Sequence, residues 1–138
     1  MVVSFALDPR LSADTREIGD LALSRALLMN DARYPWIILV PRRAGLTEIT
    51  DLDAAGRAVW MEEMARAAQI LRALPEVEKI NLGALGNVVR QLHGHVVGRR
   101  AGDAAWPGPV WGAGPALAYD AAQLEDRLGW LRNSFGLT

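Results

Sequence analysis

The sequence predicts an α+β fold, in which an antiparallel sheet packs against one long helix and a C-terminal helix. Several short apolar segments are typical of strands, and two longer segments repeat apolar residues at helical spacing. The helices lie in the middle and at the end of the chain rather than between successive strands, which favours an antiparallel sheet. A chain of 138 residues fits one domain, so we expect a single domain over residues 1–138.

Composition narrows the class of protein. The chain is 51% hydrophobic and 22% charged, which is typical of a globular protein. No apolar run approaches the ~20 residues of a membrane helix, so no membrane partner is expected. The absence of cysteine excludes disulfides and thiolate catalysis, and it favours a cytoplasmic location. A net charge of −1 argues against nucleic acid as a partner.

The first half of the chain predicts three strands. Residues 1–14 are expected in a loop or short turn, with Asp8-Pro9 as a breaker. Short apolar segments then run from Thr15 to Leu21, from Ser24 to Met29 and from Trp36 to Val40. The last of these is rich in β-branched residues, which predicts a buried strand. Turn-forming residues separate the last two segments, so we expect an antiparallel pair.

The clearest helix is predicted from Asp53 to Leu74. Apolar residues recur there at spacings of three and four: Trp60, Met64, Ala67, Leu71 and Leu74. Asp51 or Asp53 can cap its start, and Pro75 ends it. Glu62 and Arg66 have the spacing of an i,i+4 ion pair.

The second half predicts two more strands and a final helix. Lys79 to Leu85 and Val88 to Arg99 have strand character, and Gly86-Asn87 forms the turn between them. Residues 101–118 form a loop rich in Gly, Pro and Trp. A helix follows from Asp120 to about Ser134, with Asp120 and Gln123 as a capping box.

Both histidines of the chain lie two residues apart, at His93 and His95. Side chains of a strand alternate between its faces, so Gln91, His93 and His95 are expected on one side of the sheet. Three interpretations are open. The first is a structural pair, the second is a metal site completed by carboxylates such as Asp31 or Asp103, and the third is an imidazole that acts as nucleophile or acid–base catalyst.

The segment from Asn81 to Arg99 resembles the signature of the histidine-triad (HIT) superfamily. That signature has a strand with Asn, a glycine-rich turn with an amide residue, and a strand reading His-φ-His-φ-His-φ-φ, where φ is apolar. Asn30-Asp31 and the segment from Trp36 to Arg42 are similar to the family's ribose-contacting residue and to a strand ending in Pro and a basic residue. The resemblance covers roughly residues 15–105 and is greatest to a bacterial HIT-like branch.

The resemblance implies a fold of about five strands and an enzyme without cofactor or metal. His93 matches the middle histidine, which attacks the α-phosphorus of a nucleoside phosphate conjugate and forms a nucleotidyl-histidine. A backbone carbonyl is expected to hold the other ring nitrogen of His93. His95 matches the third histidine, which donates to a phosphate oxygen, and Gln91 stands in the place of the first.

Four further residues are expected to bind substrate. Asn87 matches an amide that contacts phosphate, and Asn81 matches one that supports the site. Asp31 is implied to take ribose hydroxyls, although an Asx turn is the other interpretation. Arg99 can reach a phosphate or lie at a solvated rim. The family also implies a homodimer with joined sheets, and Trp60 and Met64 give the long helix large apolar groups beyond a narrow stripe.

The sequence departs from the family pattern in ways that bear on activity. Gln91 cannot carry a proton, and Val88 stands where many members have Ser or Thr near the leaving group. Trp36 stands where a histidine often begins the strand, and Gly94 replaces a φ residue. The alternative function is therefore a nucleotide-binding protein whose catalysis has decayed.

Overall fold

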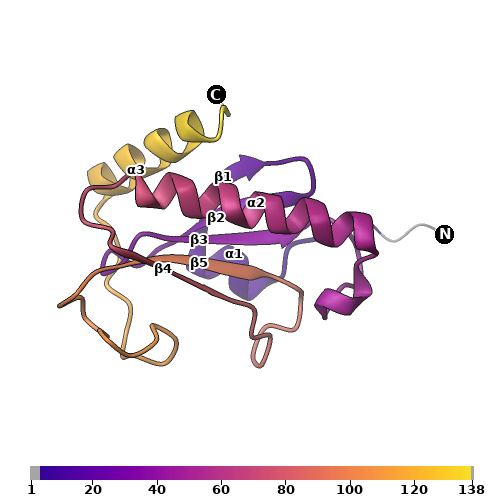
Figure 1. Ribbon diagram of the computed structural model, residues 1–138, viewed down its shortest axis with the longest axis horizontal. Helices are drawn as coiled ribbons and strands as arrows, with labels where there is room; N and C mark the ends of the chain where they lie inside the picture. The colour runs from indigo at the N-terminus through magenta and orange to yellow at the C-terminus, as the bar shows by residue number, and fades with distance from the viewer. Residues whose placement is uncertain (1–3, 138) are drawn as a thin grey trace.

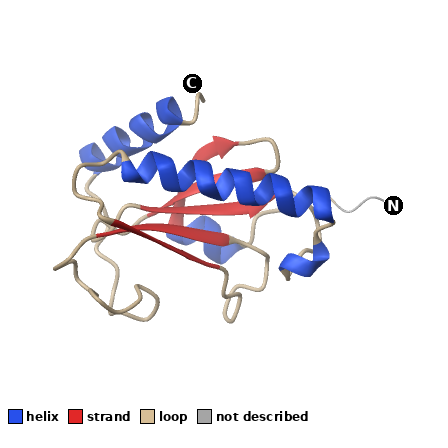
Figure 2. Ribbon diagram, in the orientation of Figure 1, coloured by secondary structure: helices blue, strands red, loops and turns tan. Residues whose placement is uncertain are grey.

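A computed structural model describes residues 4–137 as a five-stranded antiparallel sheet with helices on both faces (Figures 1 and 2). The strand order is β1-β2-β3-β5-β4. The strands are β1 (Thr15–Asp20), β2 (Ser24–Met29), β3 (Trp36–Pro41), β4 (Lys79–Gly83) and β5 (Gly94–Arg99). The helices are α1 (Pro9–Asp14), α2 (Ala54–Arg72) and α3 (Ala121–Ser134), with a 3-10 turn η1 (Ile49–Asp51) before α2. The predicted α+β class, the five strands and the two main helices are confirmed.

The inner strands β3 and β5 are covered on both faces. All six residues of each strand are buried. β2 and β3 form the predicted antiparallel pair, with Leu27 opposite Ile38. β3 then pairs with β5, although more than fifty residues separate them in the chain. His95 therefore lies in a strand that is buried along its whole length, and His93 lies just before it.

Side-chain alternation divides the core into two layers. Ile37, Leu39 and Val96 pack with α2 and α3 in one layer. Ile38 and Val97 pack in the other, together with Leu11 of α1. Figure 1 shows α2 in front of the sheet and α1 behind it. His95 alternates with Val96, so its side chain lies on the face opposite α2.

Helix α2 is attached to the start of β2 through a buried carboxylate. Asp53 caps the helix by accepting a hydrogen bond from the backbone N–H of Gly56, as predicted. Further along the helix, Glu63 accepts hydrogen bonds from the backbone N–H groups of Leu23 and Ser24, at 2.9 and 3.1 Å. These two N–H groups have their partners on the helix rather than on another strand.

Several boundaries differ from the prediction. Asp8 and Pro9 start helix α1 instead of breaking the chain, because Asp8 is its N-cap and proline is favourable in the first helical turn. The strand expected from Val88 begins only at Gly94, and residues 84–93 are irregular. β4 ends at Gly83, where Leu85 was expected. Helix α2 ends at Arg72, two residues before the predicted end.

Two local predictions have different outcomes. The capping box of Asp120 and Gln123 on α3 is confirmed. Arg66 does not use its predicted partner Glu62, and its Nη2 donates instead to the carbonyl oxygen of Phe135, at 2.6 Å.

Gly94 faces α2, and a Cβ at this position would lie 2.7 Å from the sulfur of Met64. None of the helices described, over residues 4–137, has the length and apolarity needed to cross a membrane.

We predict that Glu63→Ala destabilises the protein by about 2 kcal/mol, because two buried backbone N–H groups lose their acceptor. The exposed neighbour Glu62 provides the matched control, and Glu62→Ala should change stability by less than about 0.5 kcal/mol. Urea unfolding of both variants measures the difference. Equal stabilities would show that the carboxylate contributes nothing to the attachment of α2.

Candidate active site

The two histidines lie side by side at the start of β5. His95 is the second residue of the strand, opposite Ile38 of β3 and Gly83 of β4. His93 precedes the strand, and the two ring centroids are 4.9 Å apart at an interplanar angle of 66°. Each residue is 6% exposed. The expected pairing of His93 and His95 on one side of the sheet is thus present, although only His95 belongs to a strand.

His93 is held through one ring nitrogen. Its Nδ1 lies 2.6 Å from the carbonyl oxygen of Gln91. A carbonyl can only accept, so Nδ1 carries the hydrogen and the neutral ring keeps its lone pair on Nε2. The expected backbone carbonyl is therefore present, and it belongs to Gln91.

His95 lies between two indoles. Trp36 Nε1 donates to His95 Nδ1 at 3.0 Å. The rings of Trp36 and Trp111 lie 5.7 and 5.4 Å from the His95 ring, measured between centroids. Burial, and secondarily the charge of His93, lowers the pKa of His95 to about 3. His95 is therefore neutral across the physiological range.

A cavity of about 430 Å³ opens beside His95. Its apolar wall includes Met29, Val110 and Trp111, and its polar side includes Asp31 and Arg33. His95 lines this cavity, whereas His93 does not. The cavity combines aromatic and apolar surface with a few polar groups, which is the composition of a small-molecule site.

Asp31 lies at this cavity with its carboxylate already engaged. It is 2% exposed, and its oxygens accept hydrogen bonds from the Arg33 backbone N–H, the Arg33 guanidinium and the Leu117 N–H. Burial by itself raises the pKa of the Asp31 carboxyl, but the hydrogen bonds from Arg33 and Leu117 outweigh it and lower this pKa. The bond to the Arg33 N–H is the Asx turn, the second of our two interpretations. Ribose contact by Asp31 stays a prediction that this geometry does not support.

Arg99 is buried rather than at a solvated rim. It is 1% exposed, and its guanidinium donates twice to the Asp103 carboxylate, at 2.8 and 2.9 Å. It also donates to Asn81 Oδ1 and to the carbonyl oxygen of Gly108. These bonds join β5, β4 and the 101–118 loop. Phosphate contact by Arg99 stays a prediction without support, because its donors are used internally, whereas the supporting place expected for Asn81 fits this contact.

The 101–118 loop folds back over the face of the sheet that carries His95. Arg33 Nη1 donates to the carbonyl oxygen of Ala113, and the Leu117 carbonyl accepts from the Ala32 N–H. Trp111 lies against Gly83, where a Cβ would be only 2.8 Å from the Trp111 ring. A glycine at position 83 therefore lets this indole reach His95.

The Gln91 side chain is hydrogen-bonded to the segment that precedes α1. Its Oε1 accepts from the Asp8 N–H and its Nε2 donates to the Ala6 carbonyl oxygen, both at 2.8 Å. The side chain thus holds the segment before α1, and its catalytic role stays a prediction that these bonds do not support. Asn87 and Val88 are both exposed in the 84–93 connection, Val88 by 71%, and neither lines the cavity beside His95.

The sequence did not identify Trp36 as a partner of His95. This contact could be found only from the pairing of β3 with β5, because Trp36 lies opposite Val97 and therefore diagonally next to His95. Trp111, from the 101–118 loop, packs against His95 and also lines the cavity.

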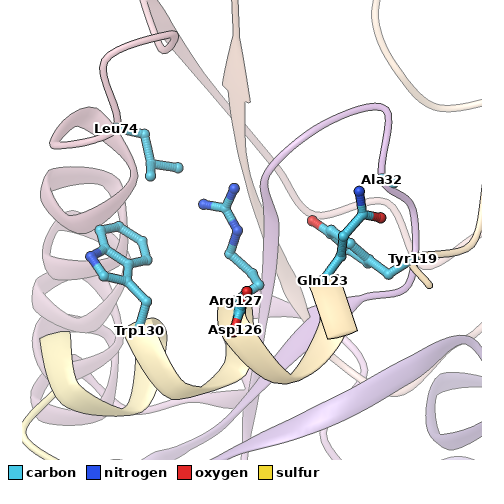
Figure 3. Close-up of a pocket in the computed structure, with 7 residues that line it drawn as sticks. All are labelled: Ala32, Leu74, Tyr119, Gln123, Asp126, Arg127 and Trp130. Atoms are coloured by element: carbon cyan, nitrogen blue, oxygen red, sulfur yellow. The ribbon is translucent and has the colours of Figure 1, made fainter. Parts of the chain in front are cut away.

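A second cleft, of about 410 Å³, lies away from the histidines (Figure 3). Arg127 and Trp130 of α3 line it together with Leu74 after α2 and with Tyr119 (Figure 3).

Within residues 4–137, no group of three or more His, Asp or Glu side chains is placed to hold a metal ion.

Comparison with known proteins defines the class. A family model described as the HIT domain matches residues 10–102. The chain therefore belongs to the HIT family, whose members are in general nucleotide-binding proteins of the hydrolase type. Among proteins of curated function, none matches this chain.

Three bacterial histidine triad proteins of known structure are similar over nearly the whole chain. That from Bradyrhizobium japonicum is 46% identical, with a TM-score of 0.93, covering 96% of this chain and 99% of its own. That from Sinorhizobium meliloti is 45% identical, with a TM-score of 0.91 and coverages of 94% and 96%. That from Marinobacter aquaeolei is 40% identical, with a TM-score of 0.94 and coverages of 97% and 98%.

The buried ion pair of Arg99 and Asp103 generates a prediction. Asp103→Asn should destabilise the protein by about 3 kcal/mol, because the Arg99 charge stays buried without its counter-charge. The exposed Asp126 of α3 provides the control variant Asp126→Asn. Denaturant unfolding with Trp fluorescence measures both. A loss no larger than that of the control would mean that Asp103 does not compensate the charge of Arg99.

The same pair predicts a pH dependence with a definite sign. The hydrogen bond from Arg99 lowers the pKa of Asp103, despite the opposing effect of burial. The stabilisation that the Asp103 carboxylate contributes is thus fully present above the unfolded-state pKa of ~3.9. It is lost as pH falls through the lower pKa that Asp103 has in the folded protein. The stability difference between wild type and Asp103→Asn should stay constant near neutrality and narrow only in acid.

Proposed function

We propose that the protein is a hydrolase or nucleotidyltransferase that acts at the α-phosphate of nucleoside phosphate conjugates, with His93 as the nucleophile. The observation that carries the proposal is the hydrogen bond between His93 Nδ1 and the Gln91 carbonyl. It orients the ring and leaves a lone pair on Nε2, as an imidazole nucleophile requires. Membership of the HIT family supports the same reaction class.

The proposed reaction proceeds by two displacements. Nε2 of His93 forms a bond to the α-phosphorus while the bond from phosphorus to the leaving group breaks. The leaving group departs with the electron pair and takes a proton from solvent or a neighbouring donor. Water then attacks the phosphorus of the nucleotidyl-histidine and releases a proton to solvent, while the P–N bond breaks and the ring nitrogen recovers its lone pair. An acceptor other than water makes the same enzyme a transferase.

The surroundings of His93 support a substrate held by the neighbouring cavity. The Trp111 ring and the apolar side chains of Met29 and Val110 offer a surface for a base. The Arg33 side chain, 17% exposed, is the accessible cation on the polar side. Because His93 is only 6% exposed, productive binding requires the groups around its ring to move. We retain Asn87 as a proposed phosphate contact reached through such movement.

A homodimer is part of the proposal. β4 forms one edge of the sheet, and an unpaired edge is a template for another strand. Leu82 and Leu85, at and after this edge, are 51% and 46% exposed. Pairing of β4 with its copy would join two sheets and cover these side chains.

The cytoplasm stays the proposed compartment, because the chain contains no cysteine.

A second candidate function is nucleotide binding with weakened catalysis. It is favoured by the low exposure of His93 and by Gln91, whose side chain is bonded to Asp8 and Ala6. The two candidates share the site and differ in turnover.

We predict that wild-type protein converts labelled adenosine 5′-phosphoramidate or a dinucleoside polyphosphate, and that His93→Ala lowers the rate by at least about 100-fold. Mass spectrometry of quenched wild-type reactions should find a nucleotidyl adduct on His93. Glu62→Ala, on the exposed face of α2, serves as a folded control with unchanged rate. Turnover that survives in His93→Ala excludes the nucleophile, and saturable binding without turnover in wild type establishes the second candidate.

A further inference from the structure

Trp36 is the residue of β3 whose side chain is hydrogen-bonded to the His95 ring. It is the first residue of β3, is 6% exposed, and lies opposite Val97 of β5. In an antiparallel pair, a side chain also contacts the diagonal neighbour two residues away on the partner strand. For Trp36 that neighbour is His95, and its indole Nε1 donates to His95 Nδ1 at 3.0 Å.

The direction of this hydrogen bond follows from the chemistry of the two rings. An indole N–H can donate and cannot accept. His95 Nδ1 must therefore supply a lone pair, so it carries no hydrogen. In the neutral ring the hydrogen then resides on Nε2. A hydrogen on Nδ1 would face the Trp36 N–H and break this hydrogen bond. The contact with Trp36 therefore also disfavours the charged, doubly protonated His95 ring.

His93 has the opposite arrangement, since its Nδ1 carries the hydrogen that it donates to the Gln91 carbonyl. Neighbouring histidines are thus held in opposite tautomers, one with a free lone pair on Nε2 and one with a hydrogen there. The spacing of the two histidines does not distinguish their tautomers, and their hydrogen-bond partners do.

The groups around His95 are consistent with a neutral donor. The indoles of Trp36 and Trp111 beside it do not titrate. His93, 4.9 Å away between centroids, opposes a second positive charge. Across the cavity, Asp31 is neutralised by its ion pair with Arg33, while Asp14 lines the same cavity from α1. Burial lowers the pKa of His95 in the same sense.

We propose that Trp36 is a positioning residue that holds His95 in the tautomer with its hydrogen on Nε2, so that His95 acts as a hydrogen-bond donor to an anionic phosphoryl oxygen. The donor role rests on the proposed function, whereas the tautomer follows from the contact with Trp36 alone. In this arrangement His95 exchanges no proton during turnover.

Nuclear magnetic resonance of ¹⁵N-histidine-labelled protein tests the tautomer directly. The chain has two histidines, so only two rings contribute, and His93→Gln assigns the signals. In wild type the His95 ring should show hydrogen on Nε2 only, unchanged from about pH 5 to about pH 8. In Trp36→Phe, which keeps an aromatic ring and removes the N–H, the two tautomers should mix and the ring should protonate more readily.

Trp130→Phe is the matched control, because this indole lies on α3 at the second cleft (Figure 3), and it should leave both histidine rings unchanged. A wild-type His95 that carries hydrogen on Nδ1, or that titrates near pH 6.5, overturns the proposal. So does a Trp36→Phe protein with the wild-type tautomer. If Trp36→Phe does not fold, the wild-type pH series decides the question by itself.

Kinetics with adenosine 5′-phosphoramidate test the donor role separately. Trp36→Phe should lower kcat on the order of 10-fold with little change in KM, because a donor to the transition state is no longer held in place. A mixed tautomer with unchanged kcat overturns the donor role and leaves the tautomer assignment standing. Wild-type protein without any turnover contradicts the proposed function, while the resonance experiment still decides the tautomer.

Discussion

The pairing of β3 with β5 is the constraint on which the site depends. Its register sets Ile38 opposite His95 and Trp36 opposite Val97, so that an indole N–H meets an imidazole nitrogen. A shift of one residue would turn His95 toward α2 and move Val96 out of the core. Both strands are buried along their whole length, and this burial of apolar side chains on two faces makes such a shift costly.

A second constraint is the buried guanidinium of Arg99. Its bonds to Asp103, Asn81 and the Gly108 carbonyl fasten the 101–118 loop to β5 and β4. The loop in turn brings Trp111 and Val110 to the cavity beside His95. A buried charge with its donors satisfied by one carboxylate, one amide and one carbonyl tolerates few other loop conformations. The wall of the cavity therefore depends on a residue that does not face it.

Local patterns predicted the elements well where one physical signal dominated. The apolar spacing and Asp53 cap predicted α2, the capping box predicted α3, and β-branched residues predicted β3. Prediction failed between Val88 and His93, because these residues form irregular chain that is hydrogen-bonded to the N-terminal segment through Gln91. Asp8-Pro9 was also misjudged, since the same dipeptide that breaks a helix can begin one.

The residues alone predicted that His93 and His95 form a site on one strand, which was expected from Val88 to Arg99. Which ring nitrogen each histidine leaves free follows from its tertiary contacts. That choice depends on the Gln91 carbonyl for His93 and on the Trp36 indole for His95. Trp36 lies 59 positions from His95 in the chain, so the contact exists only once β3 and β5 have paired. Residue types specify what a side chain can do, and the partners that the fold brings to it specify what it does.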